Sequence, residues 1–231
     1  MSFTALLFDM DGVVIDTHHS VTVFWEDLAR KHHIQLTETI FAQHIYGTQA
    51  MYTLAKVFPH LGVEECKGVL DELARYENEL AYTEVNGVTA FLQALQQHHI
   101  QTALVTSAQP RKVGSVIEQL GLDGLFSAIV TADDVKKGKP DPQCYLLAAQ
   151  RLNKSPEQCI VFEDAISGVK AGVAAGMLCV GIQQTANAPA LKEIGARYVV
   201  PDFTSFRLDG SYGSGTNLWV NSEQSLLLSA D

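Results

Sequence analysis

The feature that most constrains this chain is a short apolar run that ends directly in two carboxylates. Residues Ala5–Phe8 are typical of a buried strand, and Asp9 and Asp11 follow them at once. Two acids so close to a buried strand repel each other, and such pairs usually persist where a cation such as Mg²⁺ lies between them. A simpler interpretation is a strand followed by an acidic turn in which Gly12 supplies the bend. The rest of the chain bears on this choice.

Strand-like apolar runs recur along the chain, with helical segments between them. The helical spacing is clear in Val88, Phe91 and Leu92, and again in a stripe that ends at Gly121. Alternating strands and helices predict a doubly wound, Rossmann-like α/β core, in which helices cover both faces of a parallel sheet. The predicted strands are Ala5–Phe8, Thr102–Thr106, Ala128–Thr131, Cys159–Phe162, Met177–Ile182 and Tyr198–Val200.

A long stretch without a clear strand separates the first predicted strand from the second. Apolar residues at helical spacing within it, beginning with Val21, Phe24 and Trp25, predict an inserted all-helical cap domain over residues 17–85. We expect this cap to move as a body about two hinges, near Asp16-Thr17 and Asn86-Gly87.

The inserted cap makes the predicted core discontinuous, with residues 1–16 and 86–208. Residues 209–231 form a C-terminal tail whose first part, rich in Gly and Ser, is typical of a flexible linker. The apolar pieces Leu218–Val220 and Leu226–Leu228 suit either an extra strand or a disordered end.

The composition of the chain limits which kinds of binding partner are expected. The chain has 231 residues, is 47% hydrophobic and carries a formal net charge of -10, which argues against nucleic acid or an anionic membrane as the main partner. No apolar run approaches ~18 residues, so no membrane span is expected. Asp9 and Asp11 interrupt the N-terminal apolar stretch, and the four cysteines form no Cys-x-x-Cys pair, so we expect a cytoplasmic protein. The sequence does not indicate an oligomeric state.

Polar and charged side chains follow several of the predicted strands. Open α/β sheets bind ligands outside the carboxyl ends of their strands, so these side chains are expected to converge. Four carboxylates, two hydroxyls and a lysine are what metal-assisted phosphoryl transfer requires. They are Asp9, Asp11, Thr106, Ser107, Lys139, Glu163 and Asp164.

Some of these residues also have simpler interpretations. Thr106 and Ser107 are suited to capping the next helix, a role that is compatible with binding an anion there. Lys136 and Lys137 are interpreted as solvated surface residues. Lys139 is the better candidate for the site, because the proline after it favours an extended backbone.

Four short motifs occur in order and resemble those of the haloacid dehalogenase superfamily. The resemblance covers about residues 4–200, and the helical insertion after the first motif is similar to the cap of the branch that holds the β-phosphoglucomutases and sugar-phosphate phosphatases. The motifs are Asp9-x-Asp11-Gly12-Val13, Val105-Thr106-Ser107, Lys139-Pro140-Asp141 and Phe162-Glu163-Asp164.

The resemblance implies a role for each residue of the site. Asp9 is expected to be the nucleophile that becomes an aspartyl-phosphate. Asp11 is expected to protonate the leaving oxygen and then to act as the base for water. Thr106 and Ser107 are expected to hold the phosphoryl oxygens, and Lys139 to neutralise them.

The resemblance also implies Mg²⁺ as the cofactor. The expected ligands are the carboxylates of Asp9 and Asp164 and the backbone carbonyl of Asp11, with Glu163 bound directly or through water. Gly12 is expected beside the phosphate, and Gln49 at the substrate.

The choice of reaction within the superfamily rests on a few positions. The dehalogenases and phosphonatases lack an acid at the position of Asp11, so its presence here favours a phosphate ester as the small-molecule substrate. The β-phosphoglucomutases carry a cap histidine and a cap arginine where this chain has Val21 and Ala50. We therefore expect a Mg²⁺-dependent phosphatase acting on small phosphate monoesters, chiefly sugar phosphates. A phosphosugar mutase is the alternative.

A non-catalytic binding or regulatory protein on the same fold is a further alternative. The intact Asp9 and Asp164 argue against it. Substrate selectivity is expected to lie in the cap, around His18, Thr48, Gln49 and Tyr52.

Overall fold

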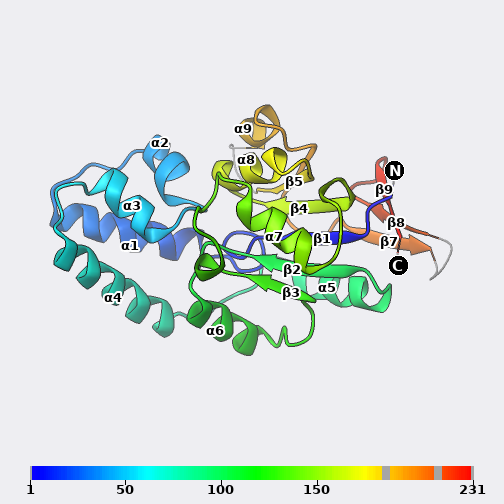
Figure 1. Ribbon diagram of the computed structural model, residues 1–231, viewed down its shortest axis with the longest axis horizontal. Helices are drawn as coiled ribbons and strands as arrows, with labels where there is room; N and C mark the ends of the chain where they lie inside the picture. The colour runs from blue at the N-terminus through cyan, green and yellow to red at the C-terminus, as the bar shows by residue number, and fades with distance from the viewer. Residues whose placement is uncertain (1, 184–187, 211–214, 230–231) are drawn as a thin grey trace.

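The computed structural model describes residues 2–183, 188–210 and 215–229, and a six-stranded parallel sheet lies at the centre of this part (Figure 1). The strand order is β3-β2-β1-β4-β5-β6, so the winding reverses between β1 and β4. The predicted doubly wound α/β fold is confirmed, and the strands end within one residue of the predicted positions. The strands are β1 (Ala5–Phe8), β2 (Gln101–Val105), β3 (Ala128–Val130), β4 (Cys159–Glu163), β5 (Leu178–Ile182) and β6 (Tyr198–Val200).

Helices cover both faces of the sheet because successive strand residues point to opposite sides. Leu6 and Phe8 of β1 pack in one apolar layer with α5 and α6, whereas Ala5 and Leu7 pack in the other with α7, α8 and α9. All four side chains are fully buried. These helices are α5 (Val88–Gln97), α6 (Pro110–Leu120), α7 (Gln143–Arg151), α8 (Ile166–Ala174) and α9 (Ala188–Glu193).

The helices between β1 and α5 form a separate lobe at the left of Figure 1. Its apolar side chains, among them Phe24, Trp25, Leu54 and Phe58, are buried against one another. We refer to this lobe as the cap. Its helices are α1 (His18–Lys31), α2 (Glu38–Ile40), the π-helical turn η1 (Phe41–Ile45), α3 (Ala50–Val57) and α4 (Val63–Glu79).

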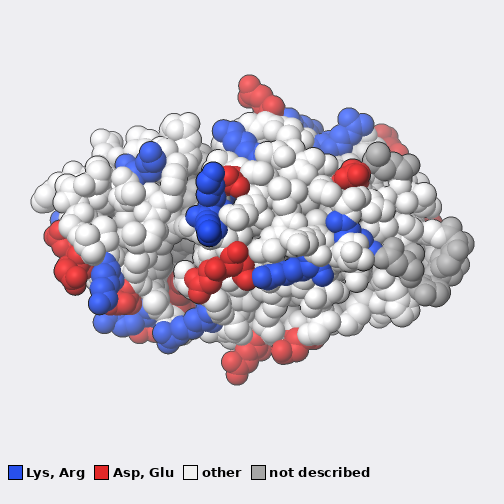
Figure 2. Space-filling model, in the orientation of Figure 1, with Lys and Arg blue, Asp and Glu red and all other residues white. Residues whose placement is uncertain are grey.

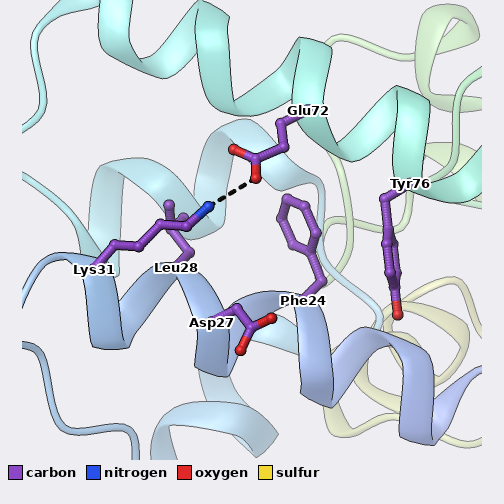
Figure 3. Close-up of a pocket in the computed structure, with 6 residues that line it drawn as sticks. All are labelled: Phe24, Asp27, Leu28, Lys31, Glu72 and Tyr76. Carbon is purple, nitrogen blue, oxygen red and sulfur yellow. Dashed lines mark hydrogen bonds and ion pairs between the residues drawn. The ribbon is translucent and has the colours of Figure 1, made fainter.

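Two cap helices, α1 and α4, face each other across a small pocket (Figure 3). Phe24 of α1 lies beside Tyr76 of α4, with 5.5 Å between the ring centroids. Lys31 Nζ donates to Glu72 Oε1 at 2.8 Å and connects the same two helices. The cap is therefore held together by its own contacts.

The two connections between the cap and the sheet run side by side. Asp16 N donates to Thr83 O at 2.9 Å, and Val85 N donates to Val14 O at 3.0 Å. Gly87 follows with φ 81°, a left-handed conformation that glycine adopts without strain. This pairing brings both predicted hinge regions to one place in the molecule.

The described part of the C-terminal tail, together with Arg207 and Leu208 just before it, forms a three-stranded antiparallel sheet. It contains β7 (Arg207–Gly210), β8 (Thr216–Trp219) and β9 (Ser225–Leu228). Phe3 N donates to Leu227 O at 2.9 Å, so the N-terminal segment lies against this sheet. Of the two possibilities left open by the sequence, the apolar pieces of the tail are strands. Residues 211–214 of the predicted linker, and residues 230–231, lie outside the described residues.

The surface carries charges of both signs. On the face in Figure 2, the described Lys and Arg side chains lie among Asp and Glu side chains rather than in one continuous basic patch. Among the described helices, none combines the length and the apolar character that crossing a membrane requires.

Candidate active site

The carboxyl ends of the strands meet a cavity that is lined by both the core and the cap. The cavity has a volume of about 580 Å³. Asp9 N donates to Phe162 O at 3.0 Å, and Thr106 N donates to Val130 O at 2.9 Å, so the ends of the strands fix where these two side chains leave the sheet. The predicted site residues that line the cavity are Asp9, Asp11, Gly12, Gln49, Thr106, Ser107 and Asp164.

Lys139 lies behind Asp9, outside the lining of the cavity. Its Nζ donates to Asp9 Oδ1 and Glu163 Oε1, both at 2.6 Å, and to Val105 O at 3.1 Å. The side chain is 1% exposed. With three acceptors around it, this ammonium group fixes the orientation of the Asp9 carboxylate.

Glu163 is held from several sides. Tyr145 OH donates to its Oε1 at 2.6 Å, and Ala165 N donates to its Oε2 at 3.3 Å. Gly168 leaves room for it, because a Cβ atom there would lie 1.8 Å from Glu163 Oε1. Sequence reasoning did not single out Tyr145, since it belongs to the apolar stripe of α7 and is typical of a core residue.

Asp9, Glu163 and Asp164 form a cluster of three carboxylates, and Lys139 is the lysine that pairs within it. Burial raises the pKa of Asp9 to about 7, although Lys139 lowers it, and Glu163 adds to the rise. Burial also holds the pKa of Asp164 well above its usual range, with further contributions from Glu163 and Asp9. A second cation would relieve this repulsion.

The donor set of the site fits Mg²⁺. Oxygen atoms of Asp9, Glu163 and Asp164 all lie within 4.8 Å of one another. Asp164 Oδ1 is buried and has no hydrogen-bond partner among the described residues. Gly12, with φ 80°, packs so closely on Asp164 that a Cβ atom would lie 2.0 Å from Oδ2. Carboxylate oxygens are the ligands that Mg²⁺ prefers, and an unpartnered one is available here.

The two hydroxyls after β2 do not cap the helix that follows. Thr106 Oγ1 accepts a hydrogen bond from Ala108 N at 3.0 Å, while Gln109 occupies the N-cap position of α6. Ser107 Oγ donates to Gly47 O of the cap at 3.2 Å. The capping interpretation is therefore wrong, and both hydroxyls lie at the cavity.

The cap contributes some, but not all, of the residues expected at the substrate. Gln49 lines the cavity and packs on Gly138, where a Cβ atom would lie 3.0 Å from Gln49 Cδ. His18 also lines it and stacks on Tyr46, and burial lowers the pKa of His18. Tyr52 is 37% exposed and lies outside the lining, so the expectation that it faces the substrate is wrong.

Lys112, which sequence reasoning did not single out, also belongs to the site. Its Nζ donates to Asp11 Oδ1 at 2.7 Å and lies 3.0 Å from Glu77 Oε1. Burial lowers the pKa of Lys112, but these two carboxylates outweigh it and hold that pKa above its usual value. The signal in the sequence was the pair Arg111-Lys112 in the first turn of a helix, where the helix dipole disfavours cations.

Comparison with known proteins identifies the family. The family model of the haloacid dehalogenase-like hydrolases matches residues 3–176. This chain belongs to that family. The resemblance inferred from the four motifs is therefore confirmed.

Relatives of this hydrolase include named phosphatases. It is 33% identical to validoxylamine A 7'-phosphate phosphatase of Streptomyces hygroscopicus subsp. limoneus. That alignment has 207 residues and covers 89% of this chain and 96% of that protein. The chain is 35% identical over 199 residues to phosphorylated carbohydrates phosphatase of Thermotoga maritima, 83% of this chain and 91% of that protein. The solved structure of β-phosphoglucomutase from Clostridium difficile is 27% identical, with a TM-score of 0.73 over 87% of this chain and 91% of that one.

Proposed function

We propose that this hydrolase is a Mg²⁺-dependent phosphatase that cleaves small phosphate monoesters, chiefly sugar phosphates, through an aspartyl-phosphate on Asp9. The observation that carries the proposal is the cluster of Asp9, Glu163 and Asp164, of which the first two pair with the buried Lys139, at the carboxyl ends of the strands and beside a large cavity. Two relatives named as phosphatases, one of phosphorylated carbohydrates, support the substrate class.

In the first step, an oxygen of the Asp9 carboxylate forms a bond to phosphorus, and the bond from phosphorus to the ester oxygen breaks. Asp11 gives a proton to that oxygen, so the sugar leaves as a neutral alcohol. Lys139 orients Asp9 for this attack. The hydroxyls of Thr106 and Ser107 donate to the phosphoryl oxygens.

In the second step, Asp11 takes a proton from water, whose oxygen forms the new bond to phosphorus. The bond between phosphorus and Asp9 breaks, which releases inorganic phosphate and restores the carboxylate. The cap lies over the cavity and keeps bulk water from the site while the phosphoryl group is on Asp9.

The carboxylates of Asp9 and Asp164 and the carbonyl of Asp11 would hold the Mg²⁺ ion. When bound, the ion supplies positive charge to the phosphoryl oxygens. Both oxygens of Glu163 already accept hydrogen bonds, so we assign it contact with the ion through water and a second role in holding Lys139.

The cavity favours a phosphatase over a phosphosugar mutase. A mutase must hold a second phosphate group while the sugar turns over. Val21 and Ala50, at the positions where the resemblance would place a histidine and an arginine in a mutase, both line the cavity and offer only apolar side chains.

A screen of phosphate esters with Mg²⁺ or with EDTA tests this function. We expect release of inorganic phosphate only with Mg²⁺, and almost none from folded Asp9→Asn protein, which loses the nucleophile without a change of size. β-Glucose 1-phosphate with a trace of the bisphosphate belongs in the screen. Isomerisation faster than phosphate release would indicate the mutase, and full activity of Asp9→Asn would contradict both.

We also propose a cytoplasmic location. All four cysteines are unpaired, which suits a reducing compartment. Fractionation of cells with an antibody to the chain would test this.

A further inference from the structure

A buried lysine connects the cap to Asp11. Lys112 is the third residue of α6, and its side chain is only 6% exposed. Its Nζ lies 2.7 Å from Asp11 Oδ1 and 3.0 Å from Glu77 Oε1. Asp11 belongs to the core, whereas Glu77 lies in the last turn of α4 in the cap. Lys112 is therefore a direct electrostatic link between the two parts.

The position of Lys112 is electrostatically unfavourable for a lysine. The first turn of a helix disfavours a cation, and burying an ammonium group carries a desolvation penalty that its partners must offset. The exposed pair of Arg30 and Asp27, with side chains 75% and 52% exposed, avoids this desolvation. A buried ion pair is weak support for stability, so what Lys112 supplies here is a fixed geometry.

That geometry acts on one oxygen of Asp11. Thr17 Oγ1 donates to Oδ1 at 2.7 Å, and Lys112 Nζ donates to the same oxygen at 2.7 Å. Thr17 directly precedes α1, and Glu77 lies near the end of α4, so both ends of the cap reach Asp11, one of them through Lys112. Two donors on Oδ1 fix the carboxylate and leave Oδ2 for proton transfer.

We propose that Lys112 is a positioning residue that holds the Asp11 carboxylate in its working orientation and makes this orientation depend on the cap through Glu77. The inference rests on the proposed function, which gives Asp11 its acid–base role. Asp9 is oriented by a different lysine, Lys139, so Lys112 does not assist the nucleophile.

The two steps of the proposed reaction distinguish the positioning of Asp11 from a general effect on activity. With 4-nitrophenyl phosphate, the leaving nitrophenolate needs no proton, so its release in the first turnover depends on Asp9. Later turnovers depend on Asp11 as the base for water. Lys112→Met should leave the first turnover within about twofold of wild type and lower steady-state kcat by about 10²-fold, the scale of a misplaced catalytic group. KM should change little.

Combining the Lys112→Met substitution with Asp11→Asn tests whether Lys112 acts through Asp11. In Asp11→Asn protein, adding Lys112→Met should lower kcat by less than about twofold, because residues that act as a unit are not additive. Lys112→Arg should recover part of the lost rate, and Glu77→Gln should lower kcat less than Lys112→Met. Lys67→Met, at an exposed lysine of α4 outside the cavity lining, is the matched control and should behave as wild type.

Three results would overturn the proposal. They are an equal loss from Lys112→Met in both backgrounds, a raised KM with unchanged kcat, and a first turnover that slows as much as the later ones. The Lys112→Arg variant serves if thermal melting shows that Lys112→Met is unfolded at the assay temperature. Absence of any phosphoenzyme formation by the wild-type protein would instead refute the proposed function, since that step requires only Asp9.

Discussion

Lys139 and Lys112 are both buried lysines that bridge two carboxylates, but they connect different parts of the molecule. Lys139 binds Asp9 and Glu163, which both belong to the core, and all three side chains are at most 3% exposed. Lys112 binds Asp11 of the core and Glu77 of the cap, whose side chains are 25% and 24% exposed.

The difference indicates a division between the core and the cap in how they hold Asp9 and Asp11. Asp9, the proposed nucleophile, is held by Lys139, which belongs to the core, so we expect its geometry not to depend on the cap. Asp11, the proposed acid–base group, is held by Thr17 at the start of the cap and by Lys112, which also binds Glu77 of the cap, so we expect proton transfer to respond to closure of the cap. The following predictions test this division, from the largest expected effect to the smallest.

Lys139→Met should have the largest effect on both activity and stability. It leaves Asp9 and Glu163 buried together without their shared cation, and breaking such a pair typically costs about 3–5 kcal/mol. We expect almost no turnover and a lower midpoint of thermal unfolding, followed by circular dichroism. Lys112→Met should lose less of both. Equal effects of the two substitutions would refute the proposed division between core and cap.

Asp11→Asn and Asp164→Ala should fail in different ways. Asp11→Asn should lower kcat by ~10²–10⁴-fold at saturating Mg²⁺, the contribution expected of general acid–base catalysis. Asp164→Ala should first raise the Mg²⁺ concentration that half-maximal activity requires, because it removes a proposed ligand. A Mg²⁺ titration of phosphate release measures both. Rescue of Asp11→Asn by added Mg²⁺, without rescue of Asp164→Ala, would mean that the two roles are reversed.

Substitutions in the cap should change the choice of substrate. Gln49→Ala should alter the ratio of kcat/KM between two sugar phosphates by about tenfold, while hydrolysis of 4-nitrophenyl phosphate changes little. Tyr52→Ala is the control, since Tyr52 lies on the same helix as Ala50 but outside the cavity lining. A uniform loss on every substrate would show that Gln49 does not select among them.

The smallest effect is expected at an exposed ion pair outside the cavity lining. The hydrogen bonds from Arg151 and Thr131 hold the pKa of Asp134 at about 2. Because this value lies below the ordinary 3.8, the ionised carboxylate stabilises the fold above that pH, and the stabilisation is lost as the pH falls toward 2. Asp134→Asn should lower the free energy of unfolding slightly at pH 7 and flatten its decline below pH ~4. Turnover should match wild type, and a loss as large as that of Lys112→Met would contradict the division.

The sheet and the acidic part of the site were predictable because both follow from local patterns. Apolar runs fix the strands, and a parallel sheet brings their carboxyl ends together, so Asp9, Thr106 and Asp164 converge. The helical insertion was visible in the same way, from its 3.6-residue spacing.

The contacts that cross between distant segments were not predictable. Lys112 and Asp11 are 101 residues apart in the chain, and only the packing of α6 against the sheet brings them together. The role of Tyr145 was not predictable because it lies on the apolar face of its helix, where a tyrosine is typical of a core residue. Its hydroxyl nevertheless donates to Glu163. Tyr52 was expected at the substrate but lies outside the cavity lining. Its nearness to Gln49 in the sequence does not place its side chain on the same face of the helix.

Phosphoryl transfer to Asp9 is the step on which both proposals depend, and mass spectrometry can detect it directly. Asp11→Asn protein should be mixed with Mg²⁺ and 4-nitrophenyl phosphate, quenched in acid and digested. Because water attack is slowed in this variant, the phosphoenzyme should accumulate, with one phosphoryl group on the peptide that contains Asp9. The same treatment of Asp9→Asn protein should give none. A phosphoryl group on another residue, or release of nitrophenolate without any phosphoenzyme, would contradict the assignment of Asp9 as the nucleophile.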